Sequence, residues 1–349
     1  MKLAAPGKVF LAGEYAVLER EPALVAGIDR SLHAEWRELK GASLELRAGE
    51  FALSGELAAG GVRWQGGVPE GLRFAARAAE LAARFCAEEG RPPRGLSLSY
   101  LDDFSHQGRK LGLGGSAAAS VLAVRAVCAA QGRELGRRET LALALAAHWA
   151  EQGGSGSGAD VAACALGGLL EVRALHDWSS PEEALAAPAR LLKRAPIEAR
   201  TISPPPDLRL LLAFTGASAD TRALLREVKR YAAAAPSRWK WHVAALSASA
   251  RALREALEKS AREDALAAVR EAASAMAALG ESAGVGIVTE RLSRACALAS
   301  SAGAAGKPSG AGGGDCAVIF AFGDETRDAA ERALAGDFFI LRISPQEPS

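Results

Sequence analysis

The sequence predicts an α+β protein of two domains, and three observations support that prediction. The chain has 349 residues, which is long for one typical domain and suits two domains that each bury a core. Short alternating runs, typical of strands, are mixed with longer alanine-rich runs, typical of helices. Consecutive prolines at 204 to 206 forbid helix and precede a new apolar run. We therefore expect one domain at 1–202 and the other at 203–349.

Local patterns predict the elements of each domain. The apolar run from 208 to 214 predicts a buried strand directly after the prolines. Apolar residues recur at helical spacing from 262 to 279, which predicts a helix with one buried face. Further strands are predicted by short alternating or apolar runs at residues 43 to 47, 97 to 100, 316 to 322 and 338 to 343. The last two strands, backed by the helices before them, should form a small sheet.

Composition restricts the partners of the chain. Hydrophobic residues make up 49% and charged residues 24%, as in an ordinary globular protein, and the net charge is only +1. Such a balance provides no long-range field for nucleic acid or a membrane surface, so we expect a small-molecule partner.

The five cysteines are widely spaced without a C-x-x-C pair, which disfavours a disulfide framework or a zinc site. We also expect a cytoplasmic protein, since we find no signal peptide and no apolar run of membrane-spanning length. The oligomeric state does not follow from the sequence, and a monomer or a homodimer is expected.

The segment KLGLGGSAAAS, residues 110 to 120, has the character of an anion-binding turn. Its glycines allow close backbone approach, and the alanine-rich run that follows is a good helix former to about residue 131. A helix that begins near Ser116 would direct unpaired amides at an anion. Packing alone also produces glycine-rich turns before helices, so that alternative stays open.

Two common nucleotide motifs do not account for this segment. The chain has no G-x-x-x-x-G-K-[ST], because Gly306-Lys307 is followed by Pro308. The looser dinucleotide form G-x-G-x-x-A fits from Gly112 to Ala117, but the residues before it are too polar for the buried strand that this motif needs. An oxidoreductase is therefore disfavoured.

Two further segments make the pattern specific. PGKVFLAGEYAVLE, residues 6 to 19, places Lys8 beside a turn at the head of an apolar run, and GKPSGAGGGDCAV, residues 306 to 318, has five glycines before a strand. Together with KLGLGGSAAAS, they resemble the three ordered motifs of the galactokinase, homoserine kinase, mevalonate kinase and phosphomevalonate kinase superfamily. The resemblance spans almost the whole chain. It implies an N-terminal domain like ribosomal protein S5 domain 2 and a C-terminal ferredoxin-like domain.

Within this superfamily the chain is most similar to the phosphomevalonate kinases. QGGSGSGADVAA, residues 152 to 163, looks like the run that carries their active-site aspartate, here Asp160. KPSGAGGGDC, residues 307 to 316, is similar to their third motif, and AFTGASADTR, residues 213 to 222, to their substrate loop. The resemblance implies ATP-dependent phosphorylation of phosphomevalonate on the mevalonate route to isoprenoids. A mevalonate or sugar kinase of the same superfamily remains an alternative, as does a ligand sensor that kept the fold without transfer.

The resemblance also implies roles for individual residues. Lys8 supplies charge, and Asp160 orients Lys8 and the acceptor, or else serves as a helix-capping or turn aspartate. Magnesium is expected at Ser116, although this chain has Gly115 where the family usually has another serine; Glu151 either assists or is an ordinary solvated helix residue. The ATP phosphates are assigned to Gly112, Leu113, Gly114, Gly115, Ser116 and Ala117.

The acceptor carries its own phosphate and needs cations and hydroxyls. Because 220 to 230 reads as a helix start, the loop before it could present amides to an anion. The residues expected to bind the acceptor are Lys110, Ser157, Gly158, Ser218, Thr221, Arg222, Lys307, Ser309, Gly310 and Ala311. A surface role is an open alternative for several of them. We expect His148 to be a packed helix residue without a role in binding.

Overall fold

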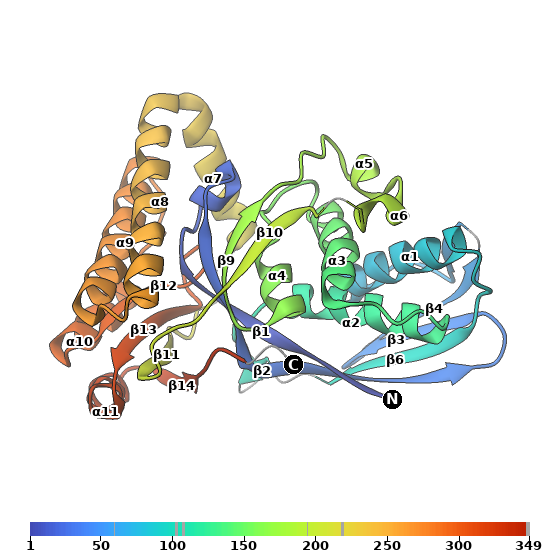
Figure 1. Ribbon diagram of the computed structural model, residues 1–349, viewed down its shortest axis with the longest axis horizontal. Helices are drawn as coiled ribbons and strands as arrows, with labels where there is room; N and C mark the ends of the chain where they lie inside the picture. The colour runs from blue at the N-terminus through green and yellow to red at the C-terminus, as the bar shows by residue number, and fades with distance from the viewer. Residues whose placement is uncertain (59, 102–103, 107–108, 194, 218–219, 347–349) are drawn as a thin grey trace.

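The molecule consists of two units that lie side by side (Figure 1). The structure is a computed structural model that describes residues 1–58, 60–101, 104–106, 109–193, 195–217 and 220–346. The unit coloured blue to green holds the N-terminal part of the chain, and the yellow to red unit holds the C-terminal part.

The first unit is built on a mixed sheet in the order β10-β9-β2-β6-β3-β4-β5, with β1 paired to β2. All of its pairs are antiparallel except β3 with β6. The long strand β2 pairs with β1, β6 and β9, so it links the two halves of the sheet. The strands are β1 (Lys2–Ala12), β2 (Ala23–Leu39), β3 (Ser43–Ala48), β4 (Phe51–Ala58), β5 (Gly61–Trp64), β6 (Gly95–Leu101), β9 (Leu169–Ala174) and β10 (Ile197–Ile202).

Helices cover one face of this sheet, as Figure 1 shows for α1 to α4. Helix α2 is apolar on nearly every side and is buried among α1, α3 and α4. A short hairpin of β7 (Ser105–His106) and β8 (Arg109–Lys110) precedes it. The helical elements are η1 (Ala16–Glu19), η2 (Glu70–Leu72), α1 (Arg73–Glu88), α2 (Gly115–Ala130), α3 (Arg137–Glu151), α4 (Ala159–Leu166), α5 (Pro181–Leu185) and α6 (Pro188–Leu191).

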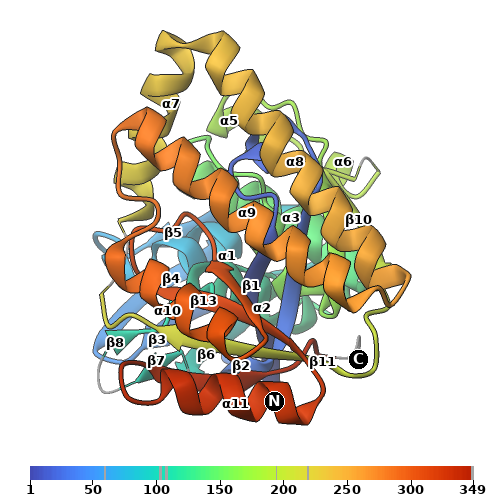
Figure 2. The same ribbon diagram turned by 90° about the vertical axis from the view of Figure 1, so that its left-hand side faces the viewer.

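The second unit has an antiparallel sheet in the order β12-β13-β11-β14. Helices α8 and α9 form a long antiparallel hairpin across the molecule, which Figure 2 shows from the front. Helices α10 and α11 pack on the sheet. The elements are β11 (Leu208–Phe214), α7 (Thr221–Ala234), α8 (Pro236–Glu258), α9 (Arg262–Ala283), α10 (Glu290–Ser301), β12 (Ala305–Pro308), β13 (Cys316–Phe322), α11 (Asp324–Leu334) and β14 (Phe339–Ile343).

The two units are tied together at the junction. Strand β10 ends at Ile202 and β11 begins at Leu208, so the division predicted at residue 203 lies in the loop between them. Apolar residues of β11 nevertheless join the same buried cluster as β1 and β2. The C-terminal tail also returns to the first sheet, where the amide of Gln346 donates to the Gly27 carbonyl over 2.7 Å. The relative position of the units is therefore fixed by shared core as well as by the connecting loop.

The local patterns are confirmed with shifts of a few residues at their ends. The buried strand at 208 to 214 is β11, and the helix expected at 262 to 279 is α9, which runs to Ala283. The turn expected beside Lys8 was wrong: β1 runs unbroken from Lys2 to Ala12, with only a register shift between Pro6 and Gly7. Glycine and proline here mark an irregularity within a strand, which a sequence pattern cannot distinguish from a turn.

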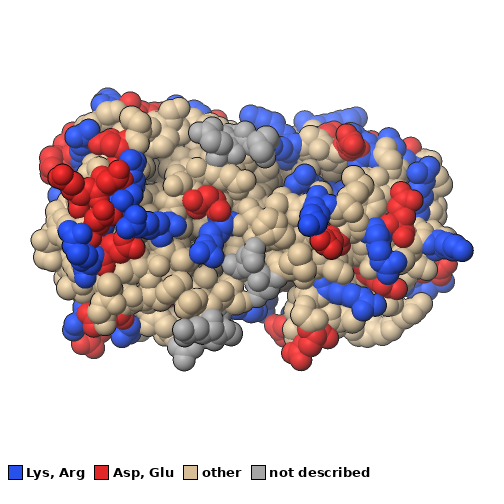
Figure 3. Space-filling model, turned by 90° about the horizontal axis from the view of Figure 1, so that it is seen from below, with Lys and Arg blue, Asp and Glu red and all other residues tan. Residues whose placement is uncertain are grey.

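The distribution of surface charges and the length of the apolar helices agree with what the composition predicts. Acidic and basic side chains are interspersed over the face shown in Figure 3. Among the described residues, no helix combines the length and the apolar character needed to cross a membrane.

Candidate active site

A glycine turn and the start of α2 lie where the sequence predicts an anion-binding turn. Gly112 and Gly114 have φ values of 69° and 84°, a region that glycine adopts at low cost, and α2 begins directly afterwards at Gly115. A Cβ at position 114 would lie 2.6 Å from Lys8 Cγ, so only glycine leaves room for that lysine. Leu113 and Ala117 are buried beneath the turn. The exposed backbone above them is a cradle that fits a phosphate group.

Lys8 crosses from this turn toward the third glycine-rich motif. Its amide donates to the Leu113 carbonyl over 2.9 Å, which joins β1 to the turn. Its side chain is half-buried and passes Gly114, and a Cβ at position 310 would lie 4.0 Å from its Nζ. The amine therefore lies between the second and third motifs. A cation there can neutralise phosphate oxygens that are held at the turn.

Asp160 lies in the first turn of α4, after Gly158, whose φ is 75°. Its Oδ1 accepts a hydrogen bond of 2.9 Å from the amide of Val161. Burial raises the pKa of the Cys164 thiol, and the charge of Asp160 raises it further while that of Lys8 lowers it. Helix α4, which carries Asp160, packs against β1, which carries Lys8, so the two charged residues lie on neighbouring elements. Ser157 is buried just before α4, and its hydroxyl accepts from the Ala159 amide over 3.3 Å.

Ser116 contacts His148, and the sequence did not predict this contact. The Nε2 atom of His148, on α3, lies 3.2 Å from Ser116 Oγ and 3.8 Å from Asp160 Oδ2. Burial lowers the pKa of His148, against the opposing effect of Asp160 and Glu151, which favours a neutral ring. The expected packed position is confirmed, because His148 is only 1% exposed. Its contact with Ser116 joins two helices and leaves no local signal in the sequence.

Glu151 lies at the end of α3 and is held by arginines of α1. Its Oε1 pairs with Arg73 over 2.6 Å and its Oε2 with Arg77 over 3.3 Å. Metal binding by Glu151 would require it to leave these pairs, so that role stays a prediction without support from this geometry. Among the described residues no cluster of three or more His, Cys, Asp or Glu side chains forms a metal cage. Magnesium is usually bound by one or two carboxylates together with substrate phosphates and water and needs no such cage, so the role expected of Ser116 beside the phosphate turn stays a prediction.

The third motif folds back on the end of β1. The Phe10 amide donates to Ser309 Oγ over 3.1 Å, and Ser309 Oγ in turn contacts the Phe10 carbonyl over 3.1 Å. The Tyr15 hydroxyl donates to the Ala311 carbonyl over 2.6 Å. These bonds fix the loop that places Gly310 beside Lys8.

Lys307, expected to contact the acceptor, is fully buried at 0% exposure and forms an ion pair with Glu14. Glu14 is 3% exposed and also accepts a hydrogen bond of 3.3 Å from the Gly310 amide. The acceptor role of Lys307 therefore stays a prediction, and its surroundings favour a structural role. Glu14 was missed because its partners lie about 300 residues away in the sequence.

The other residues expected at the acceptor lie nearer the surface. Lys110 is exposed on β8, and Thr221 and Arg222 are exposed in the first turn of α7. Asp220 caps that helix by accepting from the Ala223 amide over 2.9 Å, so its carboxylate occupies one of the amides expected to bind an anion. Ser218 lies outside the described residues. A surface pocket of about 310 Å³ lies between the start of α7 and Gly313 of the third motif.

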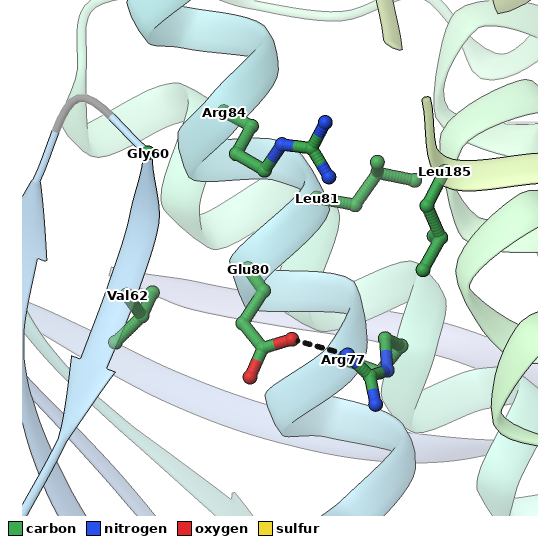
Figure 4. Close-up of a pocket in the computed structure, with 7 residues that line it drawn as sticks. All are labelled: Gly60, Val62, Arg77, Glu80, Leu81, Arg84 and Leu185. Carbon is green, nitrogen blue, oxygen red and sulfur yellow. Dashed lines mark hydrogen bonds and ion pairs between the residues drawn. The ribbon is translucent and has the colours of Figure 1, made fainter. Parts of the chain in front are cut away.

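A second pocket, of about 270 Å³, opens between β5 and α1 (Figure 4). Its charged lining includes Arg77, which pairs with Glu80 over 2.8 Å and also with Glu151. Its wall is therefore continuous with the arginines that hold the end of α3. The complete lining is Gly60, Val62, Arg77, Glu80, Leu81, Arg84 and Leu185.

Comparisons with known proteins agree with this arrangement. Residues 74–168 match the model of the GHMP kinases N terminal domain, and residues 245–340 match that of the GHMP kinases C terminal domain. A phosphomevalonate kinase of Streptomyces sp. (strain CL190) is 31% identical over 350 residues, covering 93% of this chain and 90% of that protein. The match to the N-terminal domain model includes the turn before α2 and Asp160, and the match to the C-terminal domain model includes the third motif.

Solved structures show the same fold. Streptococcus pneumoniae phosphomevalonate kinase in complex with phosphomevalonate and AMPPNP superimposes with a TM-score of 0.83 at 22% identity, covering 98% of this chain and 99% of that chain. Methanococcus jannaschii mevalonate kinase gives 0.73 at 20% identity, covering 99% and 98%. The predicted two-domain α+β fold is thereby confirmed.

Proposed function

Because the chain belongs to the GHMP kinase family, we propose that it transfers the γ-phosphoryl group of ATP to (R)-5-phosphomevalonate, giving 5-diphosphomevalonate and ADP. The observation that supports this most is the position of Lys8, which lies between the turn before α2 and Gly310 of the third motif. The kinase class follows from the family. The acceptor rests on the Streptomyces relative and on the motifs similar to those of phosphomevalonate kinases.

Phosphoryl transfer depends on positioning and on neutralising charge across the β- and γ-phosphates. The amides from Gly112 to Ser116 would hold these phosphates at the positive end of α2. Lys8 would place its amine on the oxygens between donor and acceptor. Magnesium, when bound through Ser116, would supply further positive charge across the two phosphates. A Cβ at Gly112 would meet Asp315 and one at Gly114 would meet Lys8, so glycine at these positions lets both charged side chains approach the turn.

Asp160 has an orienting role in this proposal. A phosphate monoester has a second pKa near 6, so at neutral pH it is already mostly dianionic and needs no strong base. The carboxylate of Asp160 would hold the Lys8 amine and the acceptor phosphate in register. This differs from an alcohol acceptor, which must lose a proton as it attacks.

A panel assay tests the acceptor. Purified protein with magnesium and ATP is incubated with phosphomevalonate, mevalonate, galactose or homoserine, and ADP release is measured for each. We expect turnover with phosphomevalonate to exceed that with the other three by at least two orders of magnitude, since a site built for a phosphate leaves its cations unpaired without one. Turnover of mevalonate without phosphomevalonate would make the chain a different kinase of the family. Nucleotide binding without turnover of any acceptor would favour a sensor.

A further inference from the structure

His148 occupies the space between two groups of the proposed site. Its Nε2 atom lies 3.2 Å from Ser116 Oγ, which is hydrogen-bond distance, and 3.8 Å from Asp160 Oδ2, which is not. One ring nitrogen of α3 thus bonds the serine of α2 and faces the aspartate of α4. At 1% exposure, the ring is inaccessible to bulk water.

Packing fixes the ring in this position. The Phe74 ring of α1 lies against it, with centroids 4.7 Å apart and planes tilted by 33°. Ser120 Oγ donates to the Ser116 carbonyl over 3.0 Å and also contacts the Phe74 carbonyl over 3.4 Å. Helices α1, α2 and α3 therefore meet at this point, and His148 is the polar side chain that α3 contributes.

The hydroxyl of Ser116 does not cap its own helix. A serine hydroxyl at a helix start commonly caps that helix by accepting from an amide two or three residues on. The N-cap position of α2 is instead Gly114, which has no side chain, and Ser116 Oγ bonds to His148. A hydroxyl has one proton and two lone pairs, so whichever partner donates in this bond, Ser116 Oγ keeps at least one lone pair for a cation on its other side.

We infer that His148 is a positioning residue that holds the Ser116 hydroxyl toward the magnesium and phosphates of ATP. This inference rests on the proposed function, since it assigns His148 to the nucleotide side of the same site. Residues that orient a metal-binding side chain typically contribute a factor of 10 to 100 in metal affinity or activity. The acceptor should be little affected, because His148 reaches Ser116 and only faces Asp160.

Three variants separate positioning from packing. His148→Leu removes the polar atom and keeps most of the volume, whereas His148→Gln keeps a polar atom near the place of Nε2. Leu143→Val is the matched control, because Leu143 is a fully buried residue of the same helix that this site does not use. Calorimetry measures binding of the unreactive analogue AMPPNP with and without magnesium, and thermal melting measures stability. Kinetics then give kcat, the acceptor KM and the magnesium concentration for half-maximal rate.

We expect His148→Leu to weaken magnesium-dependent AMPPNP binding and to lower kcat at limiting magnesium by about 10- to 100-fold, with little change in acceptor KM. His148→Gln should recover most of the loss, and Leu143→Val should lower the melting temperature without changing binding. In a Ser116→Ala background, His148→Leu should have little further effect, because the two residues act as one unit.

Other outcomes overturn the inference. These are wild-type binding in His148→Leu at every magnesium concentration, an equal loss in Leu143→Val, or a loss that is the same without magnesium. Failure of the proposed function is a separate result, namely wild-type protein that binds AMPPNP with magnesium but does not phosphorylate phosphomevalonate; the binding arm still tests His148 there. Wild-type protein that does not bind AMPPNP with magnesium contradicts both.

Discussion

Two lysines of glycine-rich motifs, Lys8 and Lys307, have opposite surroundings. Lys8 is half-buried, passes Gly114 and reaches the neighbourhood of Gly310, where a substrate phosphate could meet it. Lys307 is fully buried and pairs with Glu14, whose carboxylate also accepts from the Gly310 amide. A lysine that faces a cradle can serve transfer, whereas a lysine that neutralises a buried acid serves the fold. Each lysine directly follows a glycine, Gly7 or Gly306, and the two lysines differ in burial and in partner.

The pair around Lys307 also determines the surroundings of Lys8. Glu14 follows β1, the strand that carries Lys8, and holds both Lys307 and the amide beside the Lys8 amine. Tyr15, whose φ is 64°, adds its bond to Ala311. The buried ion pair thus positions the loop that the Lys8 amine approaches.

Lys307→Met should have the largest effect, and on stability. It leaves the buried Glu14 carboxylate without its partner, and breaking such a pair typically costs about 3–5 kcal/mol. Urea unfolding would measure the loss. The matched control is Lys259→Met, which removes an exposed pair with Glu255 and should cost less than about 1 kcal/mol.

A double variant sharpens this prediction. Glu14→Gln together with Lys307→Met removes both charges while keeping an acceptor for the Gly310 amide, so most of the lost stability should return. A single Lys307→Met variant that is as stable as Lys259→Met would show that Lys307 is not a buried structural partner.

Lys8→Met should have the next largest effect, and on turnover. Loss of a preorganised charge-stabilising group costs on the order of 3 kcal/mol in the barrier, or roughly a hundredfold in rate. Unfolding by urea should change little, because the side chain is half-buried and faces the site. Steady-state assays with phosphomevalonate would test this, with the exposed Lys2→Met on the same strand as control.

Asp160→Asn should cost less than Lys8→Met. The amide keeps the size and part of the hydrogen bonding of the carboxylate and loses only the orienting charge. The acidic limb of the pH profile should follow the second ionisation of the acceptor phosphate, near pH 6, and should persist in this variant. If the acidic limb disappears, or the loss exceeds that of Lys8→Met, Asp160 is an essential base and the orienting role is wrong.

Asp220→Ala should have the smallest effect on turnover and on stability. It allows a carboxylate that caps a helix to be compared with Asp160. Asp220 caps α7 through the Ala223 amide, and loss of such a cap costs about 1 kcal/mol of stability. Thermal melting would show the shift, and turnover should stay within a few-fold of wild type. A loss of turnover as large as that of Asp160→Asn would place Asp220 among the groups of the site.

The sequence predicts helices, strands and glycine turns better than it predicts which side chains contact each other. The buried strand β11 and the helix α2 follow from apolar runs and glycine punctuation, because these features act between neighbours in the chain. The roles of Lys8 and Ser116 come from their motifs and stay predictions, although the structure places both residues beside the same glycine turn. The pairing of Lys307 with Glu14 and the contact of His148 with Ser116 depend on packing between distant segments, which no local pattern records.

Single-turnover transfer from ATP to phosphomevalonate tests most directly whether Lys8 serves transfer and Lys307 serves the fold. Lys8→Met and the double variant Glu14→Gln with Lys307→Met would be compared under conditions in which both are folded. We predict that Lys8→Met is roughly a hundredfold slower than wild type. The double variant should stay within about tenfold, because it removes a structural charge pair and keeps the amine at the phosphates. A double variant slower than Lys8→Met, or a Lys8→Met variant with wild-type transfer, would contradict the account.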